Sequence, residues 1–307
     1  MRYVYLGSPV FSAVLLEHLC RAQRPPLWVV TQRAKVAGRH REMLSTPVGK
    51  MARKYELELI ETENVNEASL VQRVCEAEVD YALVVAFGQI FKKDLLGAPR
   101  EACLNIHASL LPRYRGAAPI ARALWAGEKA TGVCLQRMVS ALDAGDVLDT
   151  EVVDIAPSDT TDSLTLRLAQ ASGVLMDRAW ESLETKSYVC TRQREEEASY
   201  APKLTKKEAR LSWSKPAHVL EAQVRALYPW PIAYTHLDNK MLKVYGASLA
   251  PSLGLEPGQI QTDYKTFFKV QCAFGGLALE EVQLENKKRM PIPSFLAGYR
   301  GEFKIHV

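Results

Sequence analysis

The fold class is decided by residues 1–30, which read MRYVYLGSPVFSAVLLEHLCRAQRPPLWVV. The short apolar run Tyr3–Leu6 predicts a strand, and the apolar side chains of Val10–Ala22 recur at helical spacing. A second strand is predicted at Pro26–Val30. A strand, a helix and a strand in succession are typical of a parallel sheet covered by helices.

The same alternation continues to about residue 155 and then ends in a long helix. Further strands are predicted at Leu57–Ile60, Tyr81–Phe87, Ala102–His107, Val133–Val139 and Val147–Ile155, and further helices at Pro47–Glu56, Ala68–Ala77, Ile120–Ala126 and Thr161–Thr185. This pattern predicts an α/β domain with a Rossmann-like, doubly wound and mostly parallel sheet.

The chain changes character after the long helix. Val189–Ser199 holds Arg192, Arg194 and three consecutive glutamates with little to bury, which predicts a solvated linker. Beyond it, apolar runs flank Asp238-Asn239 and Gly275-Gly276, which are hairpin signals and predict a small β barrel or sandwich. We expect a first domain over residues 1–188, a linker over 189–205 and a second domain over 206–307.

Composition narrows the class of protein. No stretch approaches 18 consecutive apolar residues, and the N-terminus runs directly into a strand without a signal-peptide pattern. We therefore expect a cytoplasmic protein. Its six cysteines are scattered singly, which favours reduced thiols over disulfides or a metal site: Cys20, Cys75, Cys103, Cys134, Cys190 and Cys272.

Charge is distributed unevenly along the chain. Residues 198–307 hold 15 Lys and Arg against 9 Asp and Glu, whereas residues 1–197 hold 24 against 26. A basic C-terminal third indicates a domain that faces a polyanion, although an ordinary solvated basic surface is an equal alternative on charge alone.

A nucleotide cofactor is not expected on the predicted sheet. The first strand is followed by Gly7-Ser8-Pro9, and neither the G-x-G-x-x-G fingerprint nor the G-x-x-x-x-G-K-S/T phosphate loop is present. A parallel sheet still predicts a ligand site beyond the carboxyl ends of its strands.

Polar side chains gather at that expected edge. Asn105 and His107 end a predicted strand and, because side chains alternate, project from the same face. Asp143 follows on a glycine-containing loop between two later strands. An amide and an imidazole can donate hydrogen bonds to a developing oxyanion, and a carboxylate can orient the imidazole and assist proton transfer. The set suits acyl transfer to an amine, which needs no serine or cysteine nucleophile.

Longer motifs identify the family. Asn105-x-His107-x-Ser109-Leu110-Leu111-Pro112, its continuation Arg-x-Arg-Gly-Ala-Ala-Pro, and Leu142-Asp143-x-Gly145-Asp146 resemble the 10-formyltetrahydrofolate-dependent formyltransferases. The resemblance covers almost the whole chain, through Val84–Ile90, Tyr200–Leu204 and Tyr228–Pro231. It implies transfer of a formyl group from 10-formyltetrahydrofolate to the α-amino group of methionyl-initiator-tRNA, for translation initiation. We expect no metal, because no Cys/His cluster has ligand spacing, and we expect a monomer.

The resemblance also assigns residues. It implies Asn105, His107 and Asp143 as the catalytic trio, with the formyl-folate held by Ser109, Leu110, Leu111, Pro112, Phe87, Gly88, Gln89, Ile90, Val139 and Leu142. The second domain is implied to be an OB-like β barrel, a fold that often binds nucleic acid.

Contacts with tRNA are implied on a basic loop and on the second domain. The loop Arg33–Ser45 would enter the acceptor arm, although Arg33-Ala34-Lys35-Val36 lacks the prolines usual there. Flexible cations at such a loop would contact phosphates without reading sequence. The candidate phosphate contacts are Arg33, Lys35, Arg39, Arg41, Lys206, Lys207, Lys287, Lys288 and Arg289.

Two alternative functions remain open at this point. An enzyme that formylates an amino sugar nucleotide or another small amine, or a formyl-folate hydrolase, shares the Asn-x-His and Leu-Asp-x-Gly motifs. A non-catalytic RNA-binding protein with an inactive enzyme fold belongs to a different class, and the intact Asn105, His107 and Asp143 disfavour it.

Overall fold

The computed structural model describes residues 1–33, 35–37 and 42–305. Its contacts divide the chain into two compact units, each assembled from three segments. The first, called here the catalytic unit, is Met1–Pro119, Ala130–Asp154 and Thr165–Pro202. The second unit is Ile120–Lys129, Ile155–Leu164 and Lys203–Val307. Two short segments that precede the last catalytic-unit segment in the sequence therefore belong to the second unit.

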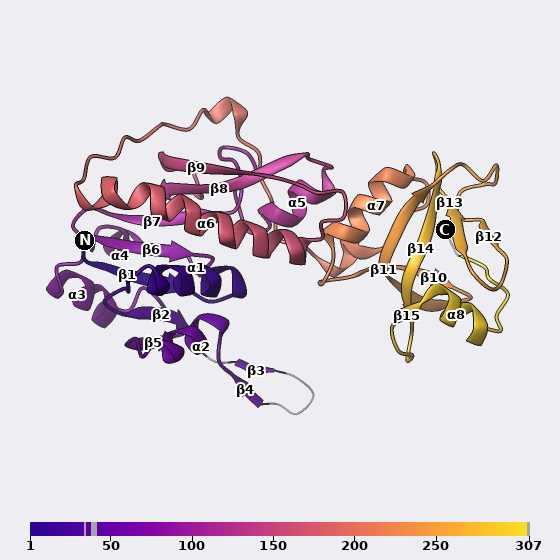
Figure 1. Cartoon of the computed structure of the whole chain (residues 1–307), viewed down its shortest axis with the longest axis horizontal. Coiled ribbons are helices and arrows are strands. Elements are labelled where there is room, and N and C mark those ends of the chain that lie inside the picture. Colours follow the sequence, from indigo (N-terminus) through magenta and orange to yellow (C-terminus); the bar gives the residue numbers. More distant parts are fainter. Residues whose placement is uncertain (34, 38–41, 306–307) are drawn as a thin grey trace. The chain divides into compact units, whose positions relative to one another are not determined.

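A seven-stranded sheet forms the centre of the catalytic unit (Figure 1). Its order is β5-β2-β1-β6-β7-β8-β9. The strands are β1 (Tyr3–Gly7), β2 (Val29–Gln32), β5 (Leu59–Thr62), β6 (Tyr81–Val85), β7 (Ala102–His107), β8 (Ala130–Arg137) and β9 (Val147–Asp154). Neighbours from β5 to β7 are parallel, whereas β7–β8 and β8–β9 are antiparallel. The predicted α/β class with a mostly parallel sheet is confirmed.

Helices cover both faces of this sheet. They are α1 (Val10–Arg21), α2 (Pro47–Lys54), α3 (Ala68–Glu76), α4 (Lys93–Leu96) and α6 (Thr161–Glu184). Strand β1 shows why its apolar run is unbroken: Val4 and Leu6 pack in one cluster with Leu70 of α3, while the ring of Tyr3 lies 5.6 Å from that of Trp180 of α6. A strand buried on both sides needs apolar residues at every position.

Two predicted segments differ from the structure. Strand β2 begins at Val29, three residues later than predicted, because Pro25 and Pro26 have no N–H to donate to a ladder. The predicted loop Arg33–Ser45 contains a small antiparallel hairpin of β3 (Lys35–Ala37) and β4 (Glu42–Leu44).

The second unit is built on an antiparallel sheet of order β10-β11-β14-β13-β12, with β15 paired to β14. The strands are β10 (Ala233–Leu237), β11 (Lys240–Ala250), β12 (Ile260–Thr262), β13 (Phe268–Gln271), β14 (Gly276–Leu284) and β15 (Met290–Pro291), and the helices are α5 (Pro119–Trp125), α7 (Ala217–Ala226) and α8 (Ile292–Gly298). Two 3₁₀ turns, Glu195–Glu197 and Lys206–Ala209, lie earlier in the chain. Both predicted hairpins are present, and the antiparallel sheet agrees with an OB-like fold.

A buried tryptophan and a tight hairpin turn stabilise the second unit. Trp213 is fully buried and donates from Nε1 to Thr235 Oγ1 at 3.1 Å. Asp238 and Asn239 take φ values of 46° and 64°, which is the left-handed geometry that a two-residue hairpin turn requires. Trp125 of α5 packs against this core, which explains why residues 120–129 belong here.

Among the described helices, none combines the length and the apolar character needed to cross a bilayer.

Candidate active site

Strand β7 presents two of the predicted catalytic side chains on one face of the sheet. In the ladder with β8, Asn105 lies opposite Gln136 and His107 lies opposite Cys134. Side chains directly opposite one another share a face, so these four residues form one patch. Ile106 points to the other face and is buried.

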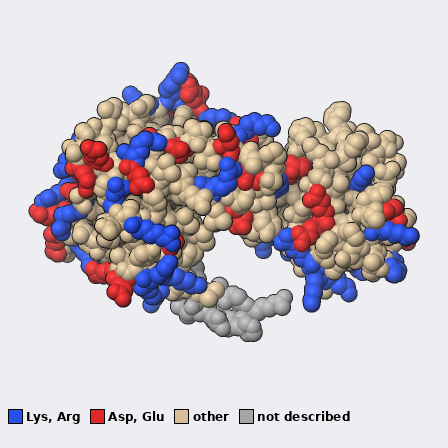
Figure 2. Space-filling model, viewed as in Figure 1, with Lys and Arg blue, Asp and Glu red and all other residues tan. Residues whose placement is uncertain are grey.

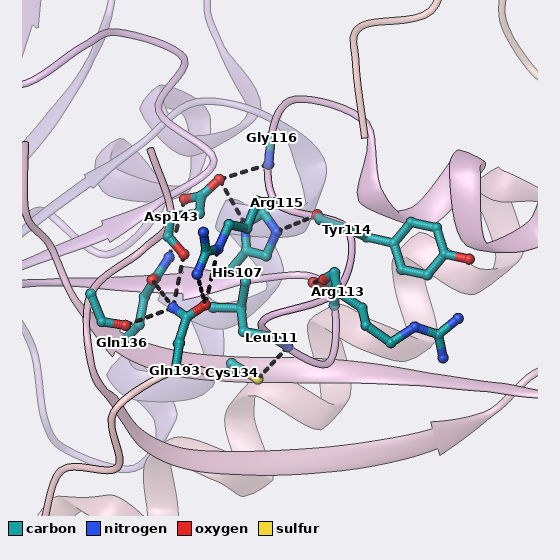
Figure 3. Close-up of polar contacts among 12 residues, drawn as sticks. His107, Leu111, Arg113, Tyr114, Arg115, Gly116, Cys134, Gln136, Asp143 and Gln193 are labelled. Atoms are coloured by element: carbon teal, nitrogen blue, oxygen red, sulfur yellow. Dashed lines mark hydrogen bonds and ion pairs between the residues drawn. The ribbon is translucent and has the colours of Figure 1, made fainter. Parts of the chain in front are cut away.

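His107 is held from two sides. Its imidazole is buried, with Nε2 at 2.9 Å from the carbonyl oxygen of Tyr114 and Nδ1 at 3.7 Å from Asp143 Oδ2 (Figure 3). Nε2 is thus within hydrogen-bond distance of an oxygen, whereas Nδ1 faces the Asp143 carboxylate at a distance longer than a hydrogen bond. The structure therefore brings His107 and Asp143 together.

Asp143 reaches this place by an indirect path. Because β8 is antiparallel to β7, Arg137 at its end lies opposite Leu104, away from His107. The loop of residues 138–146, called here the Asp143 loop, must fold back over the face of the sheet to meet the imidazole. There Asp143 Oδ2 accepts from Gly116 N at 2.8 Å, and Oδ1 accepts from Gln136 Nε2 at 3.1 Å.

Asn105 completes the group. It lies directly across the ladder from Gln136, whose amide donates to Asp143. The Asn105 side chain is half-buried and makes no side-chain hydrogen bond within residues 1–33, 35–37 and 42–305. Its amide therefore keeps its hydrogen-bonding capacity, and its catalytic role stays a prediction.

The predicted folate-binding run after β7 forms a tight turn. Ser109 is buried and its Oγ donates to the carbonyl of Arg113 at 2.6 Å. The backbone N–H of Leu111 points to Cys134 Sγ at 3.4 Å, and the carbonyl of Pro112 accepts from Ser199 N at 3.3 Å. The hydroxyl of Ser109 thus stabilises the turn, and Leu110 and Leu111 are half-buried.

The second predicted folate-binding run, Phe87–Ile90, is fixed through its backbone and one amide. Gln32 Nε2 donates to the carbonyl of Phe87 at 2.6 Å. Gln89 accepts from Val65 N at 2.8 Å and donates to the carbonyl of Glu63 at 3.2 Å, so its side chain serves the loop rather than a ligand. Gly88 has a φ of 81°, which favours glycine.

Three of the predicted folate contacts are apolar and exposed. The exposed fractions are 85% for Ile90, 45% for Val139 and 62% for Leu142. Exposed large apolar side chains on loops are the kind of surface that a ligand can cover on binding. Contact between these residues and the folate stays a prediction.

The predicted tRNA contacts differ in their surroundings. Arg33 forms an exposed ion pair with Glu63 at 3.4 Å, Lys35 lies on β3, and Arg39 and Arg41 lie outside the described residues. Lys206, Lys207, Lys287 and Lys288 are exposed. Arg289 is already engaged, because it pairs with Glu281 and lies 4.3 Å from the ring centroid of Tyr245. Figure 2 shows basic and acidic side chains interspersed on the visible surface.

Sequence reasoning missed the residues that hold the Asp143 loop. Gln136 carried a weak signal, because it is a polar residue inside a predicted buried strand. Gln193 carried none, since Val189–Ser199 had been predicted to be a solvated linker. In the structure Gln193 binds both the buried Arg115 and the Asp143 loop, so this segment is not an independent linker.

No cluster of three or more His, Cys, Asp or Glu side chains suited to a metal ion occurs in the part of the chain that the structure describes.

Comparison with known proteins now adds to this geometry. The family model described as "Formyl transferase" matches residues 1–179, and that described as "Formyl transferase, C-terminal domain" matches residues 203–300. The chain is 39% identical over 299 residues to a protein of Agathobacter rectalis named methionyl-tRNA formyltransferase, covering 97% of this chain and 96% of that one. It is 38% identical over 295 residues to the protein of that name from Nitrosococcus oceani, covering 95% and 91%.

Solved structures agree at the level of the fold. An N-formyltransferase from Helicobacter canadensis in complex with folinic acid and dTDP-3-aminofucose matches with a TM-score of 0.68 at 15% identity, over 92% of this chain and 99% of that one. HypX from Aquifex aeolicus in complex with tetrahydrofolic acid matches with a TM-score of 0.65 at 17% identity, over 100% of this chain and 51% of that one.

Proposed function

The chain belongs to the formyltransferase family, and from this we propose that it transfers a formyl group from 10-formyltetrahydrofolate to the α-amino group of methionyl-initiator-tRNA. The observation that carries the proposal is the approach of Asp143 to His107 beside the unengaged amide of Asn105. The catalytic unit would hold the donor, and the second unit would bind the tRNA. We propose that the enzyme acts as a monomer in the cytoplasm.

The reaction is an exchange of one carbon–nitrogen bond for another. The amine nitrogen attacks the formyl carbon, negative charge forms on the formyl oxygen, and the bond from that carbon to N10 of the folate then breaks. A proton leaves the attacking nitrogen and an equivalent proton arrives at N10, so atoms and charge balance. A free α-amino group has a pKa of about 7.7–8.0, so a useful fraction is already unprotonated near neutral pH.

Asn105 and His107 would stabilise the charged oxygen. The amide of Asn105 is available in the structure as it stands, whereas His107 Nε2 faces the Tyr114 carbonyl. His107 therefore has to exchange one of its two contacts for the substrate. Each donor aimed at the oxyanion is worth about 10²–10³ in rate.

Asp143 would keep the imidazole oriented and assist the proton transfer. Its carboxylate is itself oriented by Gly116 N and Gln136, so it cannot rotate freely away from His107. A carboxylate beside an imidazole keeps the ring oriented and can take part in moving the proton that the attacking nitrogen releases. General acid–base assistance of this kind contributes about 10²–10⁴ in rate.

The choice of tRNA over a small amine rests on the relatives. The proteins similar over nearly their whole length carry the name methionyl-tRNA formyltransferase, whereas the sugar N-formyltransferase resembles this chain only in fold. The basic residues of the second unit and of Arg33–Ser45 would contact tRNA phosphates.

A transfer assay tests this proposal directly. With radiolabelled 10-formyltetrahydrofolate as donor, we expect label to enter charged methionyl-initiator-tRNA and not an amino sugar nucleotide supplied at the same concentration. Label found only in the sugar would show that the acceptor is an amino sugar nucleotide and not tRNA. Release of formate without an acceptor would indicate a hydrolase.

Replacing His107 tests the site. We expect His107→Ala to lower kcat about 10²–10³-fold while tRNA binding stays unchanged. Unchanged turnover would remove His107 from the mechanism.

A further inference from the structure

The Asp143 loop depends on a residue from a distant part of the chain. Gln193 Nε2 donates to the carbonyl oxygens of Asp143 at 2.8 Å and of Gly145 at 2.6 Å (Figure 3). Among the described residues, Gln193 is the hydrogen-bond donor to both carbonyls. A single side-chain amide thus joins two points of the loop.

The orientation of the Gln193 amide is unambiguous. Its Oε1 accepts from Arg115 Nε at 3.1 Å and from Nη2 at 2.9 Å. A guanidinium can only donate and a carbonyl can only accept, so the oxygen must face Arg115 and the nitrogen must face the loop. Both ends of the amide are therefore used.

Arg115 anchors this arrangement. Its side chain is 1% exposed, and its charge is balanced by Glu195, which it meets at 2.9 Å. Arg115 also precedes Gly116, whose N–H donates to the carboxylate of Asp143. Asp143 thus accepts a hydrogen bond from Gly116 at its carboxylate and one from Gln193 at its backbone carbonyl. Arg115 supports both contacts, because it precedes Gly116 in the chain and binds the side chain of Gln193.

Asp143 needs such support because its backbone is unfavourable. Its φ is 49°, in the left-handed region, which costs energy for any residue except glycine and is least costly for Asn and Asp. Such conformations persist where the surroundings over-determine them. The next turn of the loop is equally constrained, since a Cβ on Gly145 would lie 1.7 Å from the carbonyl oxygen of Arg137.

We propose that Gln193 is a positioning residue for formyl transfer, which holds the Asp143 loop so that the carboxylate meets His107. Gln193 touches neither His107 nor the expected reacting atoms, so it acts through Asp143. This inference rests on the proposed function of Asp143.

Two substitutions separate positioning from simple structural support. Gln193→Glu keeps an acceptor for Arg115 but places an oxygen, in place of the NH₂ donor, against the two loop carbonyls. Gln193→Ala removes both contacts. If Gln193 only anchors its own segment on Arg115, Gln193→Glu retains wild-type kcat. If it positions the Asp143 loop, both variants lose kcat.

The measurement is steady-state transfer to charged initiator tRNA with the full chain. We expect both variants to lower kcat about 10- to 100-fold, because a misplacement near 1 Å can cost 10²-fold, with KM for the folate changed less than about twofold. Glu196→Gln, an exposed neighbour on the same segment, is the matched control and should leave kcat unchanged. Thermal unfolding of each variant checks that the fold survives.

A double variant tests whether Gln193 acts through Asp143. In an Asp143→Asn background, adding Gln193→Glu should cost no further kcat, because coupled residues are not additive. A multiplicative loss, or wild-type kcat in Gln193→Glu, overturns the inference while leaving the function intact. Wild-type kcat in Asp143→Asn itself would instead overturn the proposed role of Asp143.

Discussion

At the scale of single residues, the site is a set of polar groups that orient one another. His107 lies between the Tyr114 carbonyl and Asp143, and Asp143 lies between Gly116 and Gln136. Of the three predicted catalytic side chains, that of Asn105 alone forms no hydrogen bond or ion pair with the residues that the structure describes. The site is therefore preorganised on the side of the imidazole and open on the side of the amide.

Two substitutions at Asp143 should separate chemistry from backbone strain. We expect Asp143→Asn and Asp143→Ala to lower kcat by a similar factor, about 10²–10⁴, since both lack the carboxylate. Asp143→Ala should also destabilise the fold by about 1–2 kcal/mol, because alanine tolerates a φ of 49° less well than asparagine. Kinetics and thermal unfolding of both variants check this, and equal melting temperatures would show that the strain is not felt.

The sequence predicted the trio but not what holds it. Asn105 and His107 could be placed on one face because strand alternation is a local rule. The residues that bind Asp143 could not be predicted in this way, because they lie far from it in the sequence. Gly116, Gln136 and Gln193 are 27, 7 and 50 positions away from Asp143. Such contacts depend on how loops fold back, which no local pattern encodes.

At the scale of elements, the reversal of direction after β7 shapes the site. Up to β7 the strands are parallel, and their carboxyl ends meet at one edge. Alternation of strands and helices in the sequence predicted this part, since each crossover helix has its own periodic pattern. No helix separates β8 from β9, and the sequence indicated two consecutive strands joined by a loop there. It did not indicate that their connecting loop would return over the sheet.

A second element-scale feature is the pairing of Arg122 on α5 with Glu208 in the 3₁₀ turn Lys206–Ala209. The two groups meet at 2.7 Å, and the hydrogen bond from Arg122 lowers the pKa of Glu208 from 4.5 to about 2. Because the folded-state pKa is depressed, the pair contributes stability above pH 4.5, and this contribution disappears as the pH falls toward 2.

We accordingly expect Glu208→Gln to be less stable than wild type at pH 6 and to approach it at pH 3. The difference at pH 6 should be about 1 kcal/mol or less, because the carboxylate is about one-third exposed and solvent screens the pair. Urea unfolding of the full chain at several pH values measures it. Glu196→Gln, whose partner Arg194 is exposed, is the control, and a gap that is constant across this range would contradict the assignment.

At the scale of the whole molecule, the two compact units are not simple sequence halves. Residues 120–129 and 155–164 pack with the C-terminal sheet although they are flanked by catalytic-unit strands. Thr161 Oγ1 donates to the Ala226 carbonyl at 2.7 Å, and Arg225 donates to the Asp159 carbonyl at 3.0 Å. A linear boundary near residue 206 would cut these contacts.

A fragment of residues 203–307 should therefore be less stable than the same segment within the full chain. It lacks Trp125, and burying a large apolar side chain contributes about 1.5–3 kcal/mol. For a domain of this size we expect the melting temperature to fall by more than about 5 °C. Trp125→Ala in the full chain should also lower the melting temperature of this unit. If the fragment melts at the same temperature as the segment in the full chain, the packing of Trp125 does not stabilise it.

Binding of tRNA should depend on the exposed lysines of the second unit. We expect Lys287→Gln combined with Lys288→Gln to weaken tRNA binding and to reduce the slope of log affinity against log salt by about 0.7–0.9 for each phosphate that the protein no longer neutralises. Filter binding at several salt concentrations measures the slope. Lys54→Gln, which removes a lysine bonded to Glu17 in the catalytic unit, should leave it unchanged. Parallel slopes for all three proteins would remove these lysines from the tRNA surface.

The tight backbone contact at Gly145 also limits how this enzyme can be redesigned. Since any side chain there would collide with the Arg137 carbonyl, a mutant library aimed at altered folate donors should leave position 145 untouched. Val139 and Leu142 lie on the same loop, are 45% and 62% exposed and are predicted folate contacts, so variation there would change the donor site without that collision. Directed evolution should therefore vary positions 139 and 142 and keep glycine at position 145.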